Sequence, residues 1–311
     1  MTPPASSTDR LARNPGPDWG YGFLRLCDRL LPEFLFRPIR FSGTMVAMAL
    51  MPVQRRHSRE YLTQVLAHRP TTWDVFRHFL AFEEALMGKL RVGNGRDIPC
   101  LYDPSAAAFE AWMAEGGPVL LGTFHIGASD MLGFQIGSHE GRRVHIVRRR
   151  VGNSHDTERL AEVSHGCVQF IWGNAPSELI FAMKAAADTG EPIALQCDRI
   201  ENARQTMDFE FLGARRSFPI TIYRLALVLD RPVIMTVGVP LGRGRSLLYG
   251  TPRFELIPGE GRREALTRAR AHFQEFLRTV ERILRERPYL WFNFIPLNPA
   301  AKPGAERSCV P

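Results

Sequence analysis

The chain of 311 residues contains very little lysine and no closely spaced pair of cysteines. Its five cysteines are widely separated, and none stands with a second cysteine or a histidine at the spacing of zinc ligands. The sequence therefore predicts no metal site, no disulfide framework and no bound cofactor. An odd number of unpaired thiols is typical of a reducing compartment.

Long apolar runs are also missing. No stretch reaches the ~18 residues that a membrane-spanning helix requires, and the longest uncharged candidate, Phe41–Gln54, has only fourteen. Residues 1–18 are rich in proline and serine and carry no apolar segment of the signal-peptide kind. We expect residues 1–18 to be a disordered tail and residues 301–311 to be flexible.

The charge balance is basic, with a net charge of +8 in which 37 of the 40 basic residues are arginine. A GC-rich genome would give the same bias. Physically, arginine presents a planar fork of donors that suits phosphate and carboxylate groups. The excess predicts an anionic partner, and nucleic acid, an anionic membrane and an acidic protein all qualify.

Residues 19–100 have the periodicity of helices, with Pro32 and Pro38 expected to kink or end the first of them. Residues 1–60 carry nine arginines against five acids, and the uncharged Phe41–Gln54 stretch lies among them. An apolar face flanked by arginine is typical of a helix that lies in a bilayer surface. A helical hairpin packed on the main domain fits the same pattern equally well.

Residues 101–300 alternate between short β-rich runs and helical stretches, which favours an α/β domain with a mixed central sheet flanked by helices. The predicted strands are Val119–Phe124, Val144–Arg148, Val168–Trp172, Ile193–Cys197, Met207–Leu212 and Val233–Val239. The predicted helices are Met131–Ser138, His155–Val163, Ser177–Asp188, Ile220–Leu229 and Arg262–Glu286. Gly242–Arg245 has the composition of a hairpin turn leading to a further strand at Ser246–Tyr249.

The most informative motif follows the first long strand, where His125 is succeeded five positions later by Asp130. In one continuous helix these side chains would point about 140° apart and could not pair. If the strand ends at His125 and a helix begins near Gly127, the turn brings the imidazole over the first helical turn. We then expect Asp130 to accept the Nδ1 proton, leaving Nε2 as a general base. Gly127 would let a substrate approach the backbone, whose N–H groups would stabilise an oxyanion.

With its context, this motif resembles the signature His-x4-Asp/Glu of the lipid A biosynthesis acyltransferase family, within the lysophospholipid acyltransferase superfamily. The similarity extends in order over residues 19–298. Its further blocks are Gly190–Arg199 ending in Asp198-Arg199, then Phe211-Leu212-Gly213, Phe218-Pro219, Leu225-Ala226 and Arg231–Ile234. Ala128-Ser129-Asp130 replaces the family's usual Asn-Trp-Glu, and the short Phe41–Gln54 segment replaces its long membrane helix. In these respects the chain looks more like a predicted-acyltransferase branch that accompanies aryl-polyene or dialkylresorcinol-type lipid pathways.

The resemblance implies a glycerolipid acyltransferase-like fold and a set of substrate-binding residues. Arg148 at a strand end would receive a phosphate or the phosphopantetheine arm of a donor, and Arg149 and Arg150 would dock acyl carrier protein. A solvated loop is the alternative for these arginines. Asp198 and Arg199 are interpreted as an ion pair that orients the acceptor loop. The remaining residues assigned to substrate are Gly127, Asn153, Arg159, Phe211, Gly213 and Pro219. The aromatic run Tyr289–Phe294 is interpreted as core or as the wall of an acyl-chain pocket.

The resulting hypothesis is an O-acyltransferase peripheral to the cytoplasmic face of a bacterial inner membrane. It would move a fatty acyl group from acyl carrier protein or acyl-CoA to a hydroxyl of a lipid or glycolipid, with His125 and Asp130 as the catalytic dyad. One alternative is a lysophospholipid or glycerol-phosphate acyltransferase, although the Glu-Gly-x-Arg-Ser/Thr block of those enzymes does not occur. Others are a hydrolase and a non-enzymatic basic membrane-binding protein. Nucleic acid is not expected, because aromatic residues are not interleaved with the basic ones.

Overall fold

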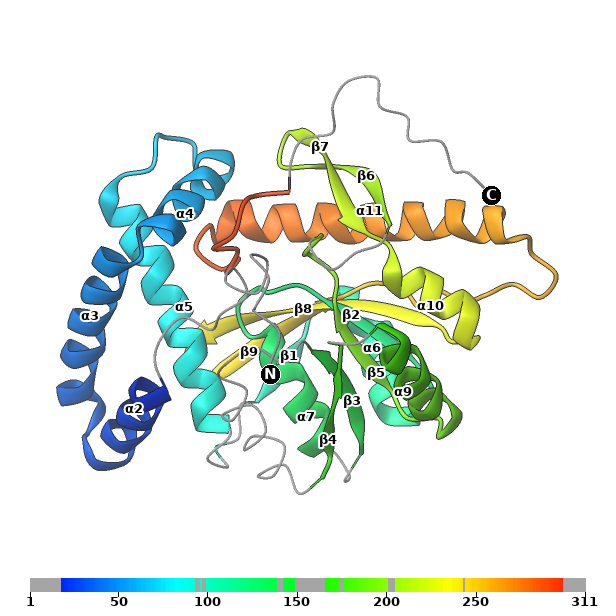
Figure 1. Cartoon of the computed structure of the whole chain (residues 1–311), viewed down its shortest axis with the longest axis horizontal. Helices are drawn as coiled ribbons and strands as arrows, with labels where there is room; N and C mark the ends of the chain where they lie inside the picture. The colour runs from blue at the N-terminus through cyan, green and yellow to red at the C-terminus, as the bar shows by residue number, and fades with distance from the viewer. Residues whose placement is uncertain are drawn as a thin grey trace, which may run out of the picture.

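The protein is a mixed α/β structure in which a seven-stranded, mostly parallel sheet is flanked by helices (Figure 1). The computed structural model describes residues 18–92, 96, 99–138, 142–148, 166–173, 176–200, 205–242 and 244–298. The strand order in the sheet is β1-β9-β8-β2-β5-β3-β4. Strands β8, β2, β5, β3 and β4 are parallel, whereas β9 pairs antiparallel with β8 and reverses the direction at that edge. This arrangement confirms the predicted mixed sheet.

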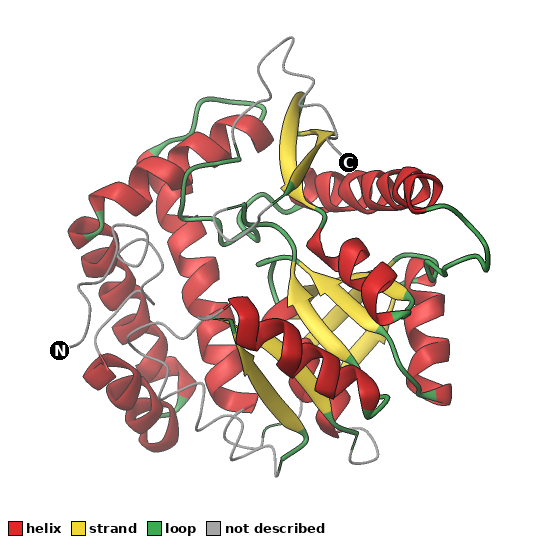
Figure 2. Cartoon of the chain, turned by 45° about the vertical axis from the view of Figure 1, so that its right-hand side comes forward, coloured by secondary structure: helices red, strands yellow, loops and turns green. Residues whose placement is uncertain are grey.

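The central strands were well placed by the sequence pattern. They are β2 (Leu120–Thr123), β3 (Val144–Arg148), β4 (Val168–Trp172), β5 (Ile193–Gln196), β8 (Val233–Gly242) and β9 (Arg245–Gly250), with the short edge strand β1 (Cys100–Tyr102). Strand β6 (Thr206–Phe211) lies outside the sheet and forms a hairpin with β7 (Ala214–Pro219), which stands above α11 in Figure 2.

Two helical layers cover the sheet, and each has its own apolar core. Helices α9 (Pro176–Asp188), α10 (Thr221–Leu229) and α11 (Arg262–Glu286) pack on one face, and their core includes Phe124, Phe273 and Phe276. Helices α6 (Ala107–Glu115) and α7 (Leu132–Ser138) cover the other face, where Leu121 and Ile234 are buried. Short 3-10 turns precede these two helices at Pro104–Ala106 and Ser129–Met131.

The N-terminal region consists of α2 (Asp18–Leu30), α3 (Glu33–Leu50), α4 (Pro52–Val65) and α5 (Thr72–Val92). Helix α3 continues through Pro38, so the helix does not end at this proline, whereas the break between α2 and α3 falls at Pro32. Pro38 lies on the exposed side of the helix, where solvent can hydrate the carbonyl that its ring leaves without a donor.

Helices α4 and α5 belong to the same core as the sheet. Tyr61, Leu62 and Phe79 are buried in the cluster that contains Phe124 and Trp291. By contrast, α2 and α3 form the outer layer of the molecule (Figure 1). In the part of the chain that the structure describes, no helix is both long and apolar enough to cross a bilayer.

Candidate active site

His125 and Asp198 meet at the carboxyl ends of two neighbouring parallel strands. The register of β2 and β5 pairs Leu121 with Ala194 and Thr123 with Gln196. Two residues further along each strand stand His125 and Asp198. Because β2 and β5 are parallel neighbours in register, both residues stand at the same edge of the sheet, just beyond the last paired positions. The sheet thus brings together residues that are 73 positions apart.

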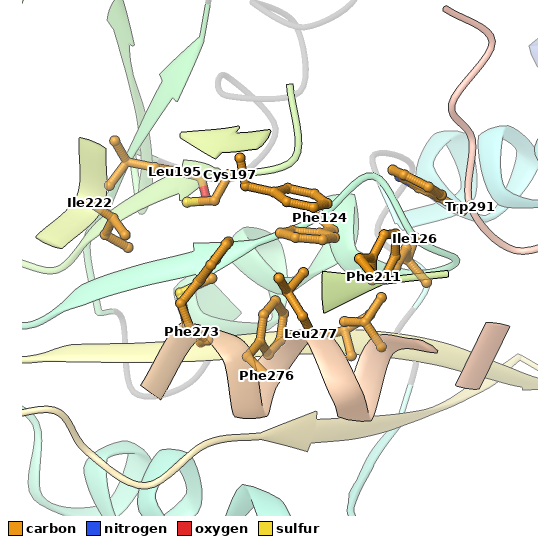
Figure 3. Close-up of a cluster of buried hydrophobic side chains, with 14 of the residues drawn as sticks. Phe124, Ile126, Leu195, Cys197, Phe211, Ile222, Phe273, Phe276, Leu277 and Trp291 are labelled. Atoms are coloured by element: carbon orange, nitrogen blue, oxygen red, sulfur yellow. The ribbon is translucent and has the colours of Figure 1, made fainter. Parts of the chain in front are cut away.

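The residues on either side of His125, Phe124 and Ile126, are buried in the core on the α11 side of the sheet. Phe124 and Ile126 are buried in the core that also contains Phe276 of α11, and Figure 3 shows Phe124 beside Phe276 and Ile126 beside Phe211. Phe124 also stacks on Phe218, with ring centroids 5.8 Å apart. Anchoring the residues on both sides directs the imidazole away from this core.

Asp198 is a carboxylate partner of His125. The Nδ1 atom of His125 lies 2.7 Å from Oδ1 of Asp198, and the backbone N–H of His125 donates to Oδ2 at 3.2 Å. Asp198 thus occupies the Nδ1 position that was expected for Asp130, whose side chain lies outside the described part of the structure. The backbone of Asp130 lies in the 3-10 turn Ser129–Met131, and the sheet register supplies Asp198 from the end of β5.

The electrostatics of Asp198 suit this role. Burial alone would raise its pKa, because its side chain is completely inaccessible to solvent. The charge and hydrogen bond of His125, the Arg199 guanidinium and the Trp291 indole N–H outweigh burial and lower the pKa to about 2. Asp198 is thus an anion at neutral pH, and it stabilises positive charge on the imidazole. The His125 side chain remains 20% exposed.

The backbone near Gly127 has a structural role that differs from the predicted oxyanion site. Gly127 N–H donates to Leu290 O at 2.9 Å, and Ala128 N–H donates to Gly238 O at 2.9 Å. Gly127 also has a φ of +50°, and a Cβ there would lie 2.7 Å from the Gly238 carbonyl oxygen. This glycine is required for close packing against β8, and the N–H groups of Gly127 and Ala128 are engaged within the fold. The approach of substrate to Gly127 stays a prediction.

A C-terminal segment, Leu290–Asn298, encloses the dyad from the other side. Phe292 N–H donates to the His125 carbonyl at 2.8 Å, and Trp291 Nε1–H donates to Asp198 Oδ2 at 3.0 Å. Asn298 holds the Asp198 carbonyl through its amide at 3.3 Å. The aromatic run of this segment was expected to be core or pocket wall. Its Trp291 is core, with no exposed surface, and it also contacts the dyad directly.

A small apolar cavity lies on the α7 face of the sheet, in line with the dyad. Its wall includes Leu121 and Thr123 of β2, Ala194 and Gln196 of β5, and Arg148 at the end of β3. The free space inside is about 50 Å³, which is smaller than the roughly 150 Å³ that admits a benzene ring. The cavity must widen before it can hold an extended ligand.

The other predicted substrate residues are distributed more widely. Arg148 lines the cavity, and its guanidinium lies 5.8 Å from the Phe170 ring centroid. Phe211, Gly213 and Pro219 belong to the β6–β7 hairpin. Phe211 is buried in the core and Gly213 takes the positive φ of the turn. Arg149, Arg150, Asn153, Arg159 and the predicted helix His155–Val163 lie outside the described residues.

Ser129 and Cys197 lie close to the dyad in sequence, and both side chains are buried. The Ser129 hydroxyl is buried and accepts a hydrogen bond from Gly238 N–H at 3.0 Å. Burial raises the pKa of the Cys197 thiol far above its usual value, so it stays protonated. Within the described ranges, no three His, Cys, Asp or Glu side chains cluster as metal ligands. Neither the Ser129 hydroxyl nor the Cys197 thiol is exposed for attack, and His125 can take a proton from an attacking group that the substrate supplies.

No protein-family model matches the chain, and no curated protein matches it either. Among solved structures, the 1-acyl-sn-glycerophosphate (LPA) acyltransferase PlsC from Thermotoga maritima is similar at 14% identity and a TM-score of 0.37. The match covers 81% of this chain and 98% of that one. Similarity at this level does not assign a family, and the functional conclusion has to come from the site.

Proposed function

We propose that the protein is an acyltransferase in which His125, paired with Asp198, activates a hydroxyl of a lipid or glycolipid to attack an acyl thioester. The observation that carries this proposal is a buried carboxylate paired with a partly exposed histidine, beside a buried Ser129 hydroxyl and a buried Cys197 thiol that stays protonated. The catalytic triad of a serine hydrolase combines such a His–Asp pair with a serine nucleophile, whose proton the histidine accepts. Here an acceptor hydroxyl takes the place of the serine.

In the proposed reaction, Nε2 of His125 removes the proton of the acceptor hydroxyl as its oxygen attacks the thioester carbonyl carbon. Asp198 holds the Nδ1–H tautomer and stabilises the imidazolium. When the tetrahedral intermediate collapses, the carbon–sulfur bond breaks and the imidazolium returns the proton to the thiolate. The products are an ester and a free thiol, and His125 regains its starting state.

The cavity under α7 is proposed to receive the acyl chain. Its lining is mainly apolar, and it includes Thr123 and Gln196, which stand two residues before His125 and Asp198 in sequence. Arg148 at its wall would meet a phosphate of the donor. Because the free space is small, a chain would have to displace side chains of α7, and Ala194→Phe should shorten the preferred acyl chain.

The N-terminal helices are proposed to rest on an anionic bilayer. Twelve of the seventeen exposed large apolar side chains of the described residues lie on α2–α5, and we call these twelve the apolar strip. The strip consists of Phe23, Leu26, Leu30, Phe34, Leu35, Ile39, Phe41, Met45, Val46, Leu50, Val53 and Trp73. Next to it, Arg55, Arg56 and Arg59 line a hollow of about 400 Å³. Apolar surface beside arginine is typical of interfacial binding, and it supports a peripheral location on a cytoplasmic membrane face.

Acyl carrier protein, which is acidic, is the proposed donor carrier, with acyl-CoA as the other candidate.

The direct test incubates the purified protein with lauroyl-acyl carrier protein or lauroyl-CoA and vesicles of total bacterial lipid. Mass spectrometry then identifies every lauroylated product. We expect a lauroyl ester with the wild type and none with His125→Ala. Free laurate without any ester would identify a hydrolase instead, and lauroylated lysophospholipid alone would favour the glycerolipid alternative. No turnover of either donor by a folded wild-type protein would contradict the proposal.

A further inference from the structure

Asp198 is held by a residue that lies far from it in the sequence. Its Oδ1 faces His125, while its Oδ2 receives the Trp291 indole N–H at 3.0 Å and the His125 backbone N–H at 3.2 Å. A buried carboxylate is stable only when such donors compensate for its lost hydration. Since both donors to Oδ2 lie in fixed positions, they also determine which way the plane of the carboxylate faces.

Trp291 is itself fixed by a chain of hydrogen bonds from the N-terminal helices. Its backbone carbonyl lies 2.8 Å from Nε2 of His78 on α5, and Nδ1 of His78 lies 2.8 Å from the Ser58 hydroxyl on α4. A carbonyl can only accept, so Nε2 of His78 must carry the proton and its Nδ1 must accept from Ser58. Burial lowers the pKa of His78 to about 4, which keeps it in this neutral form.

Aromatic packing completes the support. The Trp291 ring has no exposed surface and meets Tyr61 edge to face, with centroids 5.3 Å apart, and Phe211 likewise at 5.6 Å. Trp291 also pairs with Ile126 in a short antiparallel bridge beside His125. The indole therefore has little freedom to rotate away from Asp198.

We propose that Trp291 is a positioning residue for the His125–Asp198 dyad, and that His78 and Ser58 hold it in place. The N-terminal helices would thereby contribute to the geometry of the site as well as to its surroundings. This inference rests on the proposed function, in which His125 is the general base. It assigns to Trp291 no contact with substrate.

The test compares Trp291→Phe with Trp112→Phe. Trp112 is equally a buried tryptophan, and its indole N–H donates to Gly117 O at 2.9 Å, away from the dyad. A catalytic group displaced by about 1 Å can lose about 100-fold in rate. We expect Trp291→Phe to lower kcat for lauroyl transfer by roughly 10-fold to 100-fold with little change in KM, and Trp112→Phe to leave both unchanged. His78→Leu should resemble Trp291→Phe, and His78→Gln, which keeps an N–H donor, should recover part of the rate.

A second measurement is independent of turnover. The Nδ1–H proton of His125, identified by its loss in His125→Gln, should give a strongly downfield NMR resonance that broadens or moves in Trp291→Phe but not in Trp112→Phe. If Trp291→Phe fails to fold, 3-benzothienylalanine at position 291 keeps the ring shape and lacks only the N–H. Unchanged kcat and an unchanged resonance in a folded variant would overturn the inference. If the wild type transfers no acyl group, the resonance still decides whether Trp291 positions the dyad, and only the proposed function fails.

Discussion

Replacing Asp198 with asparagine should abolish most of the activity while leaving the fold intact. The position now occupied by Oδ2 receives two N–H donors, from His125 and Trp291, so the amide oxygen must take that place. The amide NH2 then faces Nδ1 of His125. Because NH2 can only donate, Nδ1 must give up its proton, and Nε2 becomes protonated and useless as a base.

The size of this effect follows from the geometry. The carboxylate and imidazole atoms are 2.7 Å apart at a buried site. Two unit charges about 4 Å apart interact by about 4 kcal/mol at an effective dielectric constant near 20. Losing that stabilisation of the imidazolium costs about a factor of 1,000 in rate. The wrong tautomer adds to this loss, so we expect kcat to fall by about 1,000-fold to 10,000-fold.

The assay is single-turnover transfer of lauroyl from the donor that the wild type uses, with thermal unfolding measured in parallel. Asp130→Asn is the matched variant, because Asp130 is the carboxylate that the sequence motif favours. We expect Asp130→Asn to retain activity within about 10-fold of wild type, since Asp198 already occupies Nδ1 of His125. The reasoning is refuted if Asp198→Asn stays near the wild-type rate and Asp130→Asn loses it.

Three other outcomes are expected from parts of the molecule outside the dyad. Burial raises the pKa of Glu83 to about 7. Neutral Glu83 therefore stabilises the folded state relative to the unfolded chain, fully so below the pKa of glutamate in the unfolded chain. This stabilisation is lost as the pH rises through the folded-state pKa near 7. Between pH 4.5 and 8, denaturant unfolding should show about 3 kcal/mol of this loss, and the loss should be absent in Glu83→Gln. Gly127→Ala should destabilise the fold by at least about 2 kcal/mol because its Cβ would meet the Gly238 carbonyl, whereas Gly190→Ala, which has a positive φ but open space, should cost only about 1 kcal/mol. Leu50→Asp should lower the affinity for phosphatidylglycerol vesicles, measured by co-sedimentation, by roughly 10-fold. Val228→Asp changes an exposed apolar position on α10 and should leave this affinity unchanged. Equal binding by both variants would argue against the apolar strip.

The element pattern of the α/β part was largely predictable from the sequence. Helix α11 was placed at its observed bounds, Arg262–Glu286, and β3 and β4 likewise. These segments have strong periodicity bounded by glycine or by clusters of charge, and local signals of this kind do not depend on the rest of the chain. The short strand β1 and the polar strand β7 were missed, because three residues or a run of arginines carry no such period.

The active site was predictable only in part, and the reason is topological. His125 was identified from its motif, and Asp198 was noticed at the end of a strand. Their pairing depends on β2 and β5 being neighbours, although β3 and β4 lie between them in sequence. A nearby acid such as Asp130 is therefore favoured by spacing alone, while the sheet order selects a distant one.

The support around the dyad was equally inaccessible to local reasoning. The hydrogen bond of Gly127 to Leu290 and that of Trp291 to Asp198 both come from a segment more than ninety residues away from its partner. A positive φ at Gly127 could have been suspected from the sequence. The group that a side chain at Gly127 would meet, the Gly238 carbonyl, could not be predicted in this way, because its position depends on how β8 packs.

The central claim is that His125 and Asp198 act as one catalytic unit. The most direct test measures single-turnover transfer rates for His125→Ala, Asp198→Asn and the double variant. Residues that work through one another show strongly non-additive losses. We predict that the double variant is no slower than His125→Ala alone. A double variant whose loss equals the product of the two single losses would show that the residues act independently and would contradict the account.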